Sequence, residues 1–283
     1  MPLDPRRFLD RVFPEKEYTY IERDTSLYAL SVGMAQDPLF LPELQFVCGA
    51  PLKVLPSQAT VIAWDYDFIL DSGIDEVLIL HGGQSVTIHN PLPAAATIVS
   101  QFRIRDLHDK GAGKGAVIVG ETRIRDKATG APLCTNLWTS YARGEGGFGG
   151  ARGPSMERPP MPVRAPDAVI ETRTSTNQAL FYRLLGDVNP LHSDPAIAAA
   201  AGFDRPIMHG NCTFGITCRA LVAGMCGYAP ERLLSLDCLF TAPGMPGDTV
   251  RTEMWKEGSS VRFRSLSKER GIELAGGGEA VVV

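Results

Sequence analysis

The 283-residue sequence has no excess of basic residues. It contains 28 Lys and Arg against 32 Asp and Glu, which gives a formal net charge of −4 and a pI near 5.8. Proteins that bind nucleic acid through the phosphate backbone need a basic surface. The composition therefore argues against a nucleic-acid partner, and an anionic ligand would depend on local basic residues.

Long apolar runs are also missing. The first residues, "MPLDPRRFLDRVFPEKEY", contain no apolar core of a signal peptide, and no run of 18 uncharged apolar residues follows. The last residues, "AVVV", do not form a peroxisomal signal of the Ser-Lys-Leu type. We expect no membrane span or membrane partner, and a stand-alone protein located in the cytoplasm.

Cysteines occur, but not in the spacing of a zinc or redox site. The six cysteines, at positions 48, 134, 212, 218, 226 and 238, form no CxxC pair, and three of them lie in one apolar stretch. Cysteine that is neither a ligand nor bridged usually behaves as a small buried apolar residue. We predict buried free thiols, in preference to a disulfide framework or a zinc site.

What the sequence does contain is enough apolar material, 44%, for one large or two ordinary domains. Between residues 144 and 166 it reads "GEGGFGGARGPSMERPPMPVRAP", a composition typical of an extended connector. We therefore predict an N-terminal half over 1–143, a connector over 144–166 and a C-terminal half over 167–283.

The two halves contain a weak internal repeat. "RDTSLYALSVGMAQDPLF" in the first half has the layout of "TSTNQALFYRLLGDVNPLH" in the second, namely a short helical pattern, a glycine and a Pro-Leu pair. With one inserted residue, Met34 aligns with Asp187 and Phe40 aligns with His192. The polar pair is therefore present only in the second half.

Regular elements follow each repeat. Residues 116–142 and 260–283 each read as strand, charged Gly-containing turn and strand, which predicts a hairpin at the end of each half. Apolar residues at helical spacing, namely Phe214, Cys218, Leu221, Val222 and Met225, predict a buried helix after "HGNC". A helix wrapped by an antiparallel sheet is a hot-dog arrangement. We predict an α+β chain with a double hot-dog fold, in which the first half has the less regular helix.

"GDVNPLHSDP" holds the strongest candidate for chemistry. Pro190 favours an extended Asn189, so the segment bends, and a compact turn lets Asp187, Asn189 and His192 project toward one point. A carboxylate and an imidazole on one water can act as general base and general acid. The alternative is a capped turn in which His192 bonds to backbone. A calcium loop is disfavoured because His192 occupies the position that requires Gly.

"RPIMHG", at residues 205–210, leads into the predicted buried helix. The N–H of Gly210 would be a free donor at the positive helix end, and glycine allows a ligand to approach the backbone. Such a donor suits a carbonyl oxygen that becomes negative during reaction. The alternative is an ordinary helix start beside a His209 that only packs.

Two glycine-rich segments have the wrong context for nucleotide binding. "KGAGKGAV", at residues 110–117, lacks the spacing of a phosphate loop and lies in a predicted hairpin turn. "GGFGG" belongs to the connector and does not link a strand to a helix. Neither segment indicates a nucleotide site.

"YRLLGDVNPLH" followed by "AGFDRPIMHGNCTFG" resembles the signature of the MaoC-like (R)-specific enoyl-CoA hydratases, or hydratase 2 family. The likeness begins near Tyr18 and includes "HGGQSVTIHNPLP", "DKGAG", "GGFGG", "PDAV" and "EMWKEG". The resemblance implies a double hot-dog subunit, a homodimer, and hydration of trans-2-enoyl-CoA to (3R)-3-hydroxyacyl-CoA. It also implies no metal and no cofactor, because the substrate carries coenzyme A.

The resemblance further implies roles for individual residues. Asp187 and His192 would be the catalytic pair, supported by Asn189, and the backbone of Gly210 would hold the thioester oxygen. The remaining positions expected to contact the CoA thioester or its acyl chain are His81, Gly82, Lys110 and Phe240.

Two alternative functions and one hypothesis remain open. A hot-dog acyl-CoA thioesterase would direct water at the carbonyl, and a non-catalytic acyl-CoA-binding protein would bind without turnover. The replacement of the polar pair by Met34 and Phe40 motivates the hypothesis that the first half opens a channel for a long or bulky acyl group.

Overall fold

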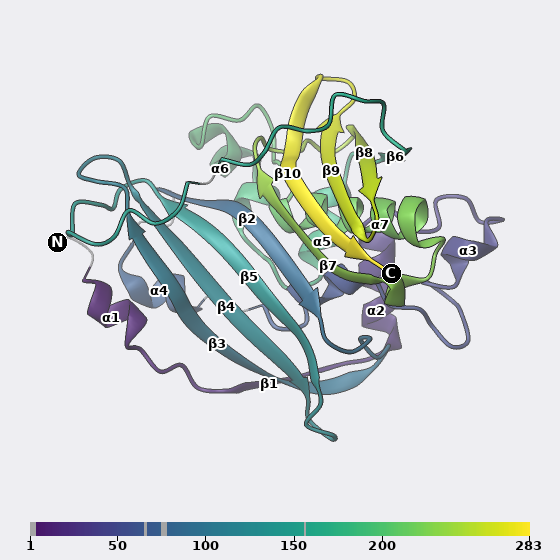
Figure 1. Cartoon of the computed structure of the whole chain (residues 1–283), viewed down its shortest axis with the longest axis horizontal. Coiled ribbons are helices and arrows are strands. Elements are labelled where there is room, and N and C mark those ends of the chain that lie inside the picture. The colour runs from purple at the N-terminus through teal and green to yellow at the C-terminus, as the bar shows by residue number, and fades with distance from the viewer. Residues whose placement is uncertain (1–3, 65–66, 75–77, 156) are drawn as a thin grey trace.

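A computed structural model describes residues 4–64, 67–74, 78–155 and 157–283. Its strands form one ten-stranded sheet in the order β1-β3-β4-β5-β2-β7-β10-β9-β8-β6 (Figure 1), and every neighbouring pair is antiparallel. The strands of the first half are β1 (Lys16–Tyr20), β2 (Ile79–Ile88), β3 (Ala96–Asp109), β4 (Ala116–Asp126) and β5 (Pro132–Ala142). Those of the second are β6 (Ala168–Arg173), β7 (Leu233–Phe240), β8 (Thr249–Glu257), β9 (Ser260–Ser267) and β10 (Ile272–Val282).

Each half contributes five consecutive strands, and the halves join where β2 pairs with β7. The pairing runs from Gly83 opposite Leu239 to Thr87 opposite Ser235. β4 pairs with β5 and β9 pairs with β10, so both predicted hairpins are confirmed. β2 and β7 would each be an exposed edge strand in a separate half. In the joined sheet their backbone N–H and C=O groups bond to each other.

The buried helix of the second half is α7 (Gly210–Cys226), as predicted. It packs against β6, β7, β8 and β10, and its residues from Asn211 to Val222 are all buried. The helix ends at Gly227, whose positive φ of 59° is a conformation that favours glycine. The second half is therefore a sheet wrapped around one helix.

The first half has no helix of that length among its described residues. The corresponding stretch holds the 3₁₀ helix η1 (Pro56–Thr60) and the short helix α4 (Asp67–Ser72). A second apolar cluster surrounds Phe68, which contacts the rings of Phe8, Phe13 and Phe102. The prediction of a less regular first helix is confirmed.

The internal repeat appears as a pair of short helices that pack together. α2 (Glu22–Ser31) lies against α5 (Gln178–Arg183), and the glycine two or three residues beyond each has a positive φ, 85° at Gly33 and 116° at Gly186. After α5 come η3 (Pro190–His192) and α6 (Pro195–Ala200), which is capped by Asp194. The shorter helices elsewhere are α1 (Pro5–Leu9), α3 (Leu41–Leu44) and η4 (Pro230–Arg232).

A buried ion pair links the halves through α7. The guanidinium of Arg219, in α7, donates to the carboxylate of Glu43, in α3, and to the hydroxyl of Thr172, in β6. Because both charged side chains are almost fully buried, loss of either would leave the other without its partner.

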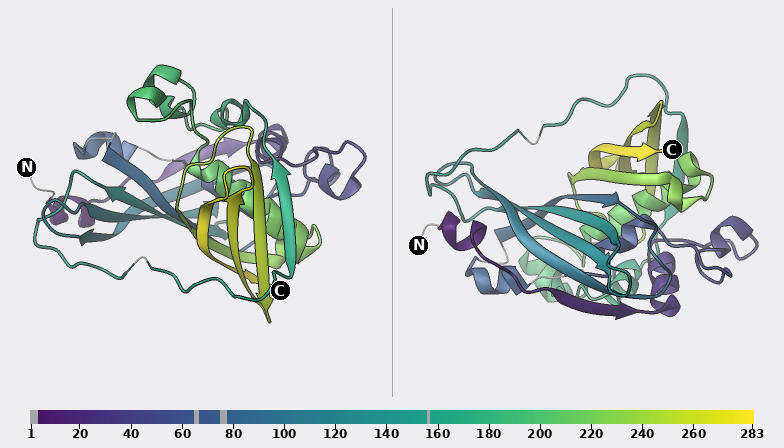
Figure 2. Two further views of the ribbon diagram at one scale, coloured as in Figure 1. Left: turned by 90° about the horizontal axis from the view of Figure 1, so that it is seen from above. Right: turned by 60° about the horizontal axis from the view of Figure 1, so that its bottom comes forward.

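The segment between β5 and β6 runs outside the sheet (Figure 2), and its described residues contain no helix or strand. It is attached to the second half by several polar contacts, which include those of Arg158, Pro159 and Arg164. Arg158 pairs with Asp237 at 2.5 Å, Arg262 donates to the Pro159 carbonyl at 2.6 Å, and the Trp255 indole donates to the Arg164 carbonyl at 2.8 Å.

No helix in the described part of the chain is long and apolar enough to cross a membrane. All six cysteines are free thiols, as predicted, and five of them are buried. The exception is Cys48, for which the expectation of burial is wrong. It lies in the exposed turn that follows α3.

Candidate active site

The turn after α5 has the local hydrogen bonds of a capped turn. A carboxylate oxygen of Asp187 accepts from the Asn189 N–H at 3.2 Å, and the side-chain oxygen of Asn189 accepts from the Leu191 N–H at 3.0 Å. Pro190 then begins η3, which carries His192. Asn189 is exposed, and its side chain bonds within the turn. It can therefore support the chemistry only by holding the turn in shape.

His192 is 9% exposed and has one ring nitrogen committed to the backbone. Its Nδ1 lies 2.9 Å from the carbonyl oxygen of Ile207, which can only accept. Nδ1 therefore carries a proton, and in the neutral ring Nε2 is the free base. The backbone bond of the capped-turn alternative is present, and it leaves the other nitrogen available for chemistry.

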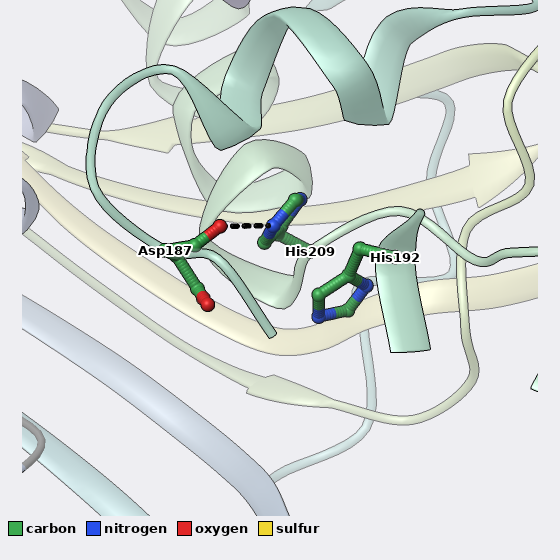
Figure 3. Close-up of side chains that lie close together, drawn as sticks. All are labelled: Asp187, His192 and His209. Atoms are coloured by element: carbon green, nitrogen blue, oxygen red, sulfur yellow. Dashed lines mark hydrogen bonds between the residues drawn. The ribbon is translucent and has the colours of Figure 1, made fainter. Parts of the chain in front are cut away.

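Asp187, His192 and His209 form one cluster (Figure 3), with candidate ligand atoms all within 4.8 Å of one another. The His209 ring lies over the His192 ring, with centroids 3.7 Å apart and planes inclined by 31°. His209 Nε2 donates to the backbone oxygen of Asp187 at 3.2 Å. From the sequence, His209 was expected only to pack beside the helix start, so this role was not predicted. The one available signal was its position directly before Gly210.

Burial shifts both members of the predicted pair toward their neutral forms. It raises the pKa of the Asp187 carboxyl and lowers the pKa of the His192 imidazole, while the attraction between the two groups opposes each shift. Their proton affinities thus approach each other. Such a pair can hold one proton in common and exchange it with a bound water.

Gly210 begins α7 immediately after His209, so its N–H lies in the first turn and has no intrahelical acceptor. A side-chain carbon at this position would lie 3.2 Å from the Phe240 ring. Phe240 in turn contacts His81 edge-to-face, with ring centroids 4.9 Å apart. Gly82 lies at the irregularity in the β2·β5 pairing. The structure therefore gathers Gly210, Phe240 and His81 from three separate segments.

Lys110 lies at a different place, on the turn between β3 and β4. Its ammonium donates to the carbonyls of Arg152 at 2.7 Å and Pro154 at 3.3 Å. Together with Lys114 and Arg152 it lines a pocket of about 460 Å³ whose lining contains no acidic residue. This pocket is suited to an anionic group.

The glycine-rich segments bind a carboxylate of the chain itself. Asp109 accepts from the N–H groups of Gly111, Gly147 and Gly149 at 2.7–2.8 Å. These bonds hold the pKa of Asp109 below its usual value. "DKGAG" and "GGFGG" are thus two parts of one structure, which fixes the start of the connector beside Lys110.

Asp187, His192 and His209 are also residue types that ligate metal ions. The stacked rings present their in-plane nitrogens side by side, whereas ligation needs them to converge on one point. One nitrogen of each ring is already hydrogen-bonded to a carbonyl. The geometry therefore suits proton transfer better than metal ligation.

The first half lacks a comparable cluster at the matching positions. Met34 is 2% exposed and belongs to the main apolar core, while Phe40 packs edge-to-face on Tyr228 with ring centroids 5.4 Å apart. Met34 therefore lies among packed side chains and lines no channel itself. The hypothesis that the first half opens a channel for the acyl group stays a prediction, and other residues would have to line that channel.

Comparison with known proteins agrees with the resemblance over almost the whole chain. Residues 18–144 match the family described as MFE-2 hydratase 2 N-terminal domain, and residues 158–277 match the MaoC like domain. The chain is 40% identical to "Enoyl-CoA hydratase 2, peroxisomal" of Arabidopsis thaliana, over 91% of this chain and 88% of that protein. It is 39% identical to "3-hydroxyacyl-thioester dehydratase Y" of Mycobacterium tuberculosis, over 100% of this chain and 96% of that protein.

Solved structures agree as well. The crystal structure of a MaoC-like dehydratase from Phytophthora capsici superposes with a TM-score of 0.87 at 33% identity, covering 99% of both chains. More distant matches, which support the fold alone, include a protein described as having a double hotdog fold. The predicted fold class is confirmed, and the chain belongs to the MaoC-like hydratase 2 family.

Proposed function

We propose that the protein catalyses the (R)-specific hydration of trans-2-enoyl-CoA to (3R)-3-hydroxyacyl-CoA, and the reverse dehydration. The observation that carries this proposal is the proximity of the Asp187 carboxylate and the His192 imidazole beside the amino end of α7. The names of the related proteins support the same reaction type.

In the proposed reaction one water is held between Asp187 and the free Nε2 of His192. One member of the pair removes a proton from the water as its oxygen bonds to C3. The other delivers a proton to C2, so the elements of water are added to one face and no redox change occurs. The pair must hold one proton between its two members for this to happen.

We assign to the N–H of Gly210 the stabilisation of the negative charge that develops on the thioester oxygen. A helix amino end offers an unpaired donor and a positive dipole there, and losing one such donor in other enzymes lowers the rate by about 10²–10³-fold. The Phe240 ring next to Gly210 supplies an apolar wall for the reacting part of the acyl chain.

The remaining binding residues follow from charge and position. We assign His81, Gly82 and Phe240 to the thioester and acyl chain, and Lys110 to the phosphates of coenzyme A. The basic pocket beside Lys110 supports this assignment. We also propose a homodimer in the cytoplasm that needs no cofactor.

The test is an assay with purified protein and crotonyl-CoA. We expect loss of the enoyl-thioester absorbance, formation of 3-hydroxybutyryl-CoA with the (3R) configuration, and no release of CoA thiol. Release of thiol without hydration would identify a thioesterase, and binding without either change would identify a non-catalytic acyl-CoA-binding protein. A panel of short, long and branched enoyl-CoA esters would then test the channel hypothesis.

A further inference from the structure

His209 contacts both of the residues to which the proposed chemistry is assigned. It contacts His192 through the face of its ring and Asp187 through a hydrogen bond, and it is 1% exposed. Tyr182 lies behind it, with ring centroids 5.0 Å apart. The ring is therefore held from several sides and cannot turn freely.

The hydrogen bond fixes which nitrogen of His209 carries the proton. The backbone oxygen of Asp187 accepts only, so Nε2 of His209 must be the donor. The Nδ1 atom is buried and has no partner among the described residues. A second proton at that nitrogen would have no acceptor, which favours a neutral ring.

The surroundings of His209 also disfavour a positive charge. Burial lowers its pKa to about 3, and a charged His192 and the guanidinium of Arg183 add to this shift. The amino end of α7 carries a partial positive charge, which also disfavours a second proton on His209. Asp187 is the acidic group that faces His192 and His209. His209 thus stays neutral while its neighbour changes charge.

A neutral ring at this place restrains both reacting groups. His192 is held at Nδ1 by Ile207, and the His209 face limits rotation about that bond. The bond to the Asp187 carbonyl holds the backbone from which the carboxylate projects. Placement matters because a 1 Å shift of a catalytic group can lower a rate by about 10²-fold.

We propose, on the basis of the proposed hydratase function, that His209 is a positioning residue, a neutral imidazole that sets the ring plane of His192 and the backbone of Asp187. It takes no proton from the substrate. It keeps water from one face of His192 and leaves Nε2 as the reactive nitrogen.

Three variants separate the two contacts. His209→Gln keeps a donor near the position of Nε2 but loses the ring, His209→Phe keeps the ring face but loses the donor, and His209→Ala loses both. With crotonyl-CoA we expect kcat to fall about 10²-fold in His209→Ala and less in the other two. KM should change by less than about threefold, because these contacts act on the catalytic groups rather than on substrate.

The pH profile distinguishes positioning from simple support of the fold. Without the ring, water reaches His192 and the pKa of His192 rises toward its ordinary value. The acid limb of kcat/KM should therefore move to higher pH in His209→Ala. The same shift is measured without activity by NMR titration of the His192 ring protons in the unliganded protein.

The matched controls are His89→Gln, His89→Phe and His89→Ala, because the exposed side chain of His89 bonds only to Thr135 across the sheet among the described residues. These should leave kcat and both pH readouts unchanged.

The inference is overturned if His209→Ala retains most of the wild-type kcat per folded molecule and its pH profile does not move. If His209→Ala does not fold, near-wild-type kcat in both His209→Gln and His209→Phe overturns it instead. If the wild type does not hydrate crotonyl-CoA but the pKa of His192 still rises in His209→Ala, the proposed function is rejected and the positioning role of His209 is retained.

Discussion

Asp187 and His192 lie within six residues of each other, yet their surroundings move their proton affinities in opposite directions. Burial raises the pKa of the acid and lowers the pKa of the base. An isolated turn would leave both near their ordinary values. At the scale of the residue, the enclosure by α7 and the Ile207 segment is what converts a capped turn into a candidate acid–base pair.

We expect Asp187→Asn and His192→Ala each to lower kcat for crotonyl-CoA hydration by about 10²–10⁴-fold, the usual contribution of general acid–base catalysis. Neither change removes a large apolar side chain, so circular dichroism and the melting temperature should stay close to those of the wild type. Asp106→Asn and His89→Ala are the matched controls. Retention of most of the activity by Asp187→Asn or by His192→Ala would reject the mechanism.

A second expectation at this scale concerns acid stability. His209 has a folded-state pKa of about 3, whereas an unfolded histidine titrates near its ordinary value of 6.5. The unfolded state therefore binds the proton first on acidification. The stability that neutral His209 contributes is complete above about pH 6.5 and is lost progressively as the pH falls toward 3, at up to about 1.4 kcal/mol per pH unit.

Urea unfolding at several values between pH 7 and pH 4.5 measures this loss. His81, whose pKa is lowered to about 4 by burial, adds to it in the same window. Carboxylates with lowered pKa values, such as Asp109 and Asp167, contribute only at lower pH. His209→Gln should therefore show a shallower slope than the wild type, and equal slopes would contradict the prediction.

At the scale of the element, α7 approaches α2 closely at a glycine. A side-chain carbon on Gly215 would lie 2.5 Å from a methyl carbon of Val32 and 2.8 Å from the Tyr28 hydroxyl. Val32 directly follows α2 and Tyr28 lies within it, so this contact sets how near the two helices lie. α2 also packs against α5, the helix that precedes the turn with Asp187.

Gly215→Ala should lower the free energy of unfolding by about 1–3 kcal/mol, the usual effect of overpacking a core. Gly224→Ala in the same helix is the control, because its side chain would meet the flexible end of Met254 at 2.8 Å. That variant also gains helix propensity, worth up to about 1 kcal/mol. Urea denaturation of both variants is the measurement, and equal stability would contradict the assigned contact.

At the scale of the whole molecule, the halves share one core. The main apolar cluster contains residues of both, among them Tyr28 and Phe46 from the first and Phe214 and Phe263 from the second. The β2·β7 pairing joins the sheets, and the Arg219–Glu43 pair is buried between them. Separation would expose apolar surface, a strand edge and an unpaired charge together.

We therefore expect residues 167–283, expressed alone, to lack a cooperative thermal transition and to aggregate. Circular dichroism and size-exclusion chromatography measure both properties, and co-expression with residues 1–166 should restore a soluble complex. A sharp transition of the isolated second half, with a native-like sheet signal, would contradict the shared-core interpretation.

The parts of the fold that the sequence predicted are those set by local patterns. Both hairpins and the buried α7 follow from periodicity and from residues with strong backbone preferences. Burial of Cys48 was predicted wrongly, because the exposure of a loop depends on what covers it. Local patterns do not predict the contact of Phe240 with Gly210, because the two residues lie on separate elements, and only the family resemblance implied that both lie at the thioester.

The chemistry available to this protein follows from its residues in chain order: an acid, an amide and an imidazole on one bent segment, and a glycine at the start of a buried helix. These depend on neighbours in the chain, whose geometry is local. Three further features appear only in the folded chain: His209 lies over His192, Asp109 accepts from both glycine-rich segments, and burial shifts the pKa values of the pair. Each of these depends on groups from different elements meeting away from water, where contacts and desolvation take effect only once the chain has folded.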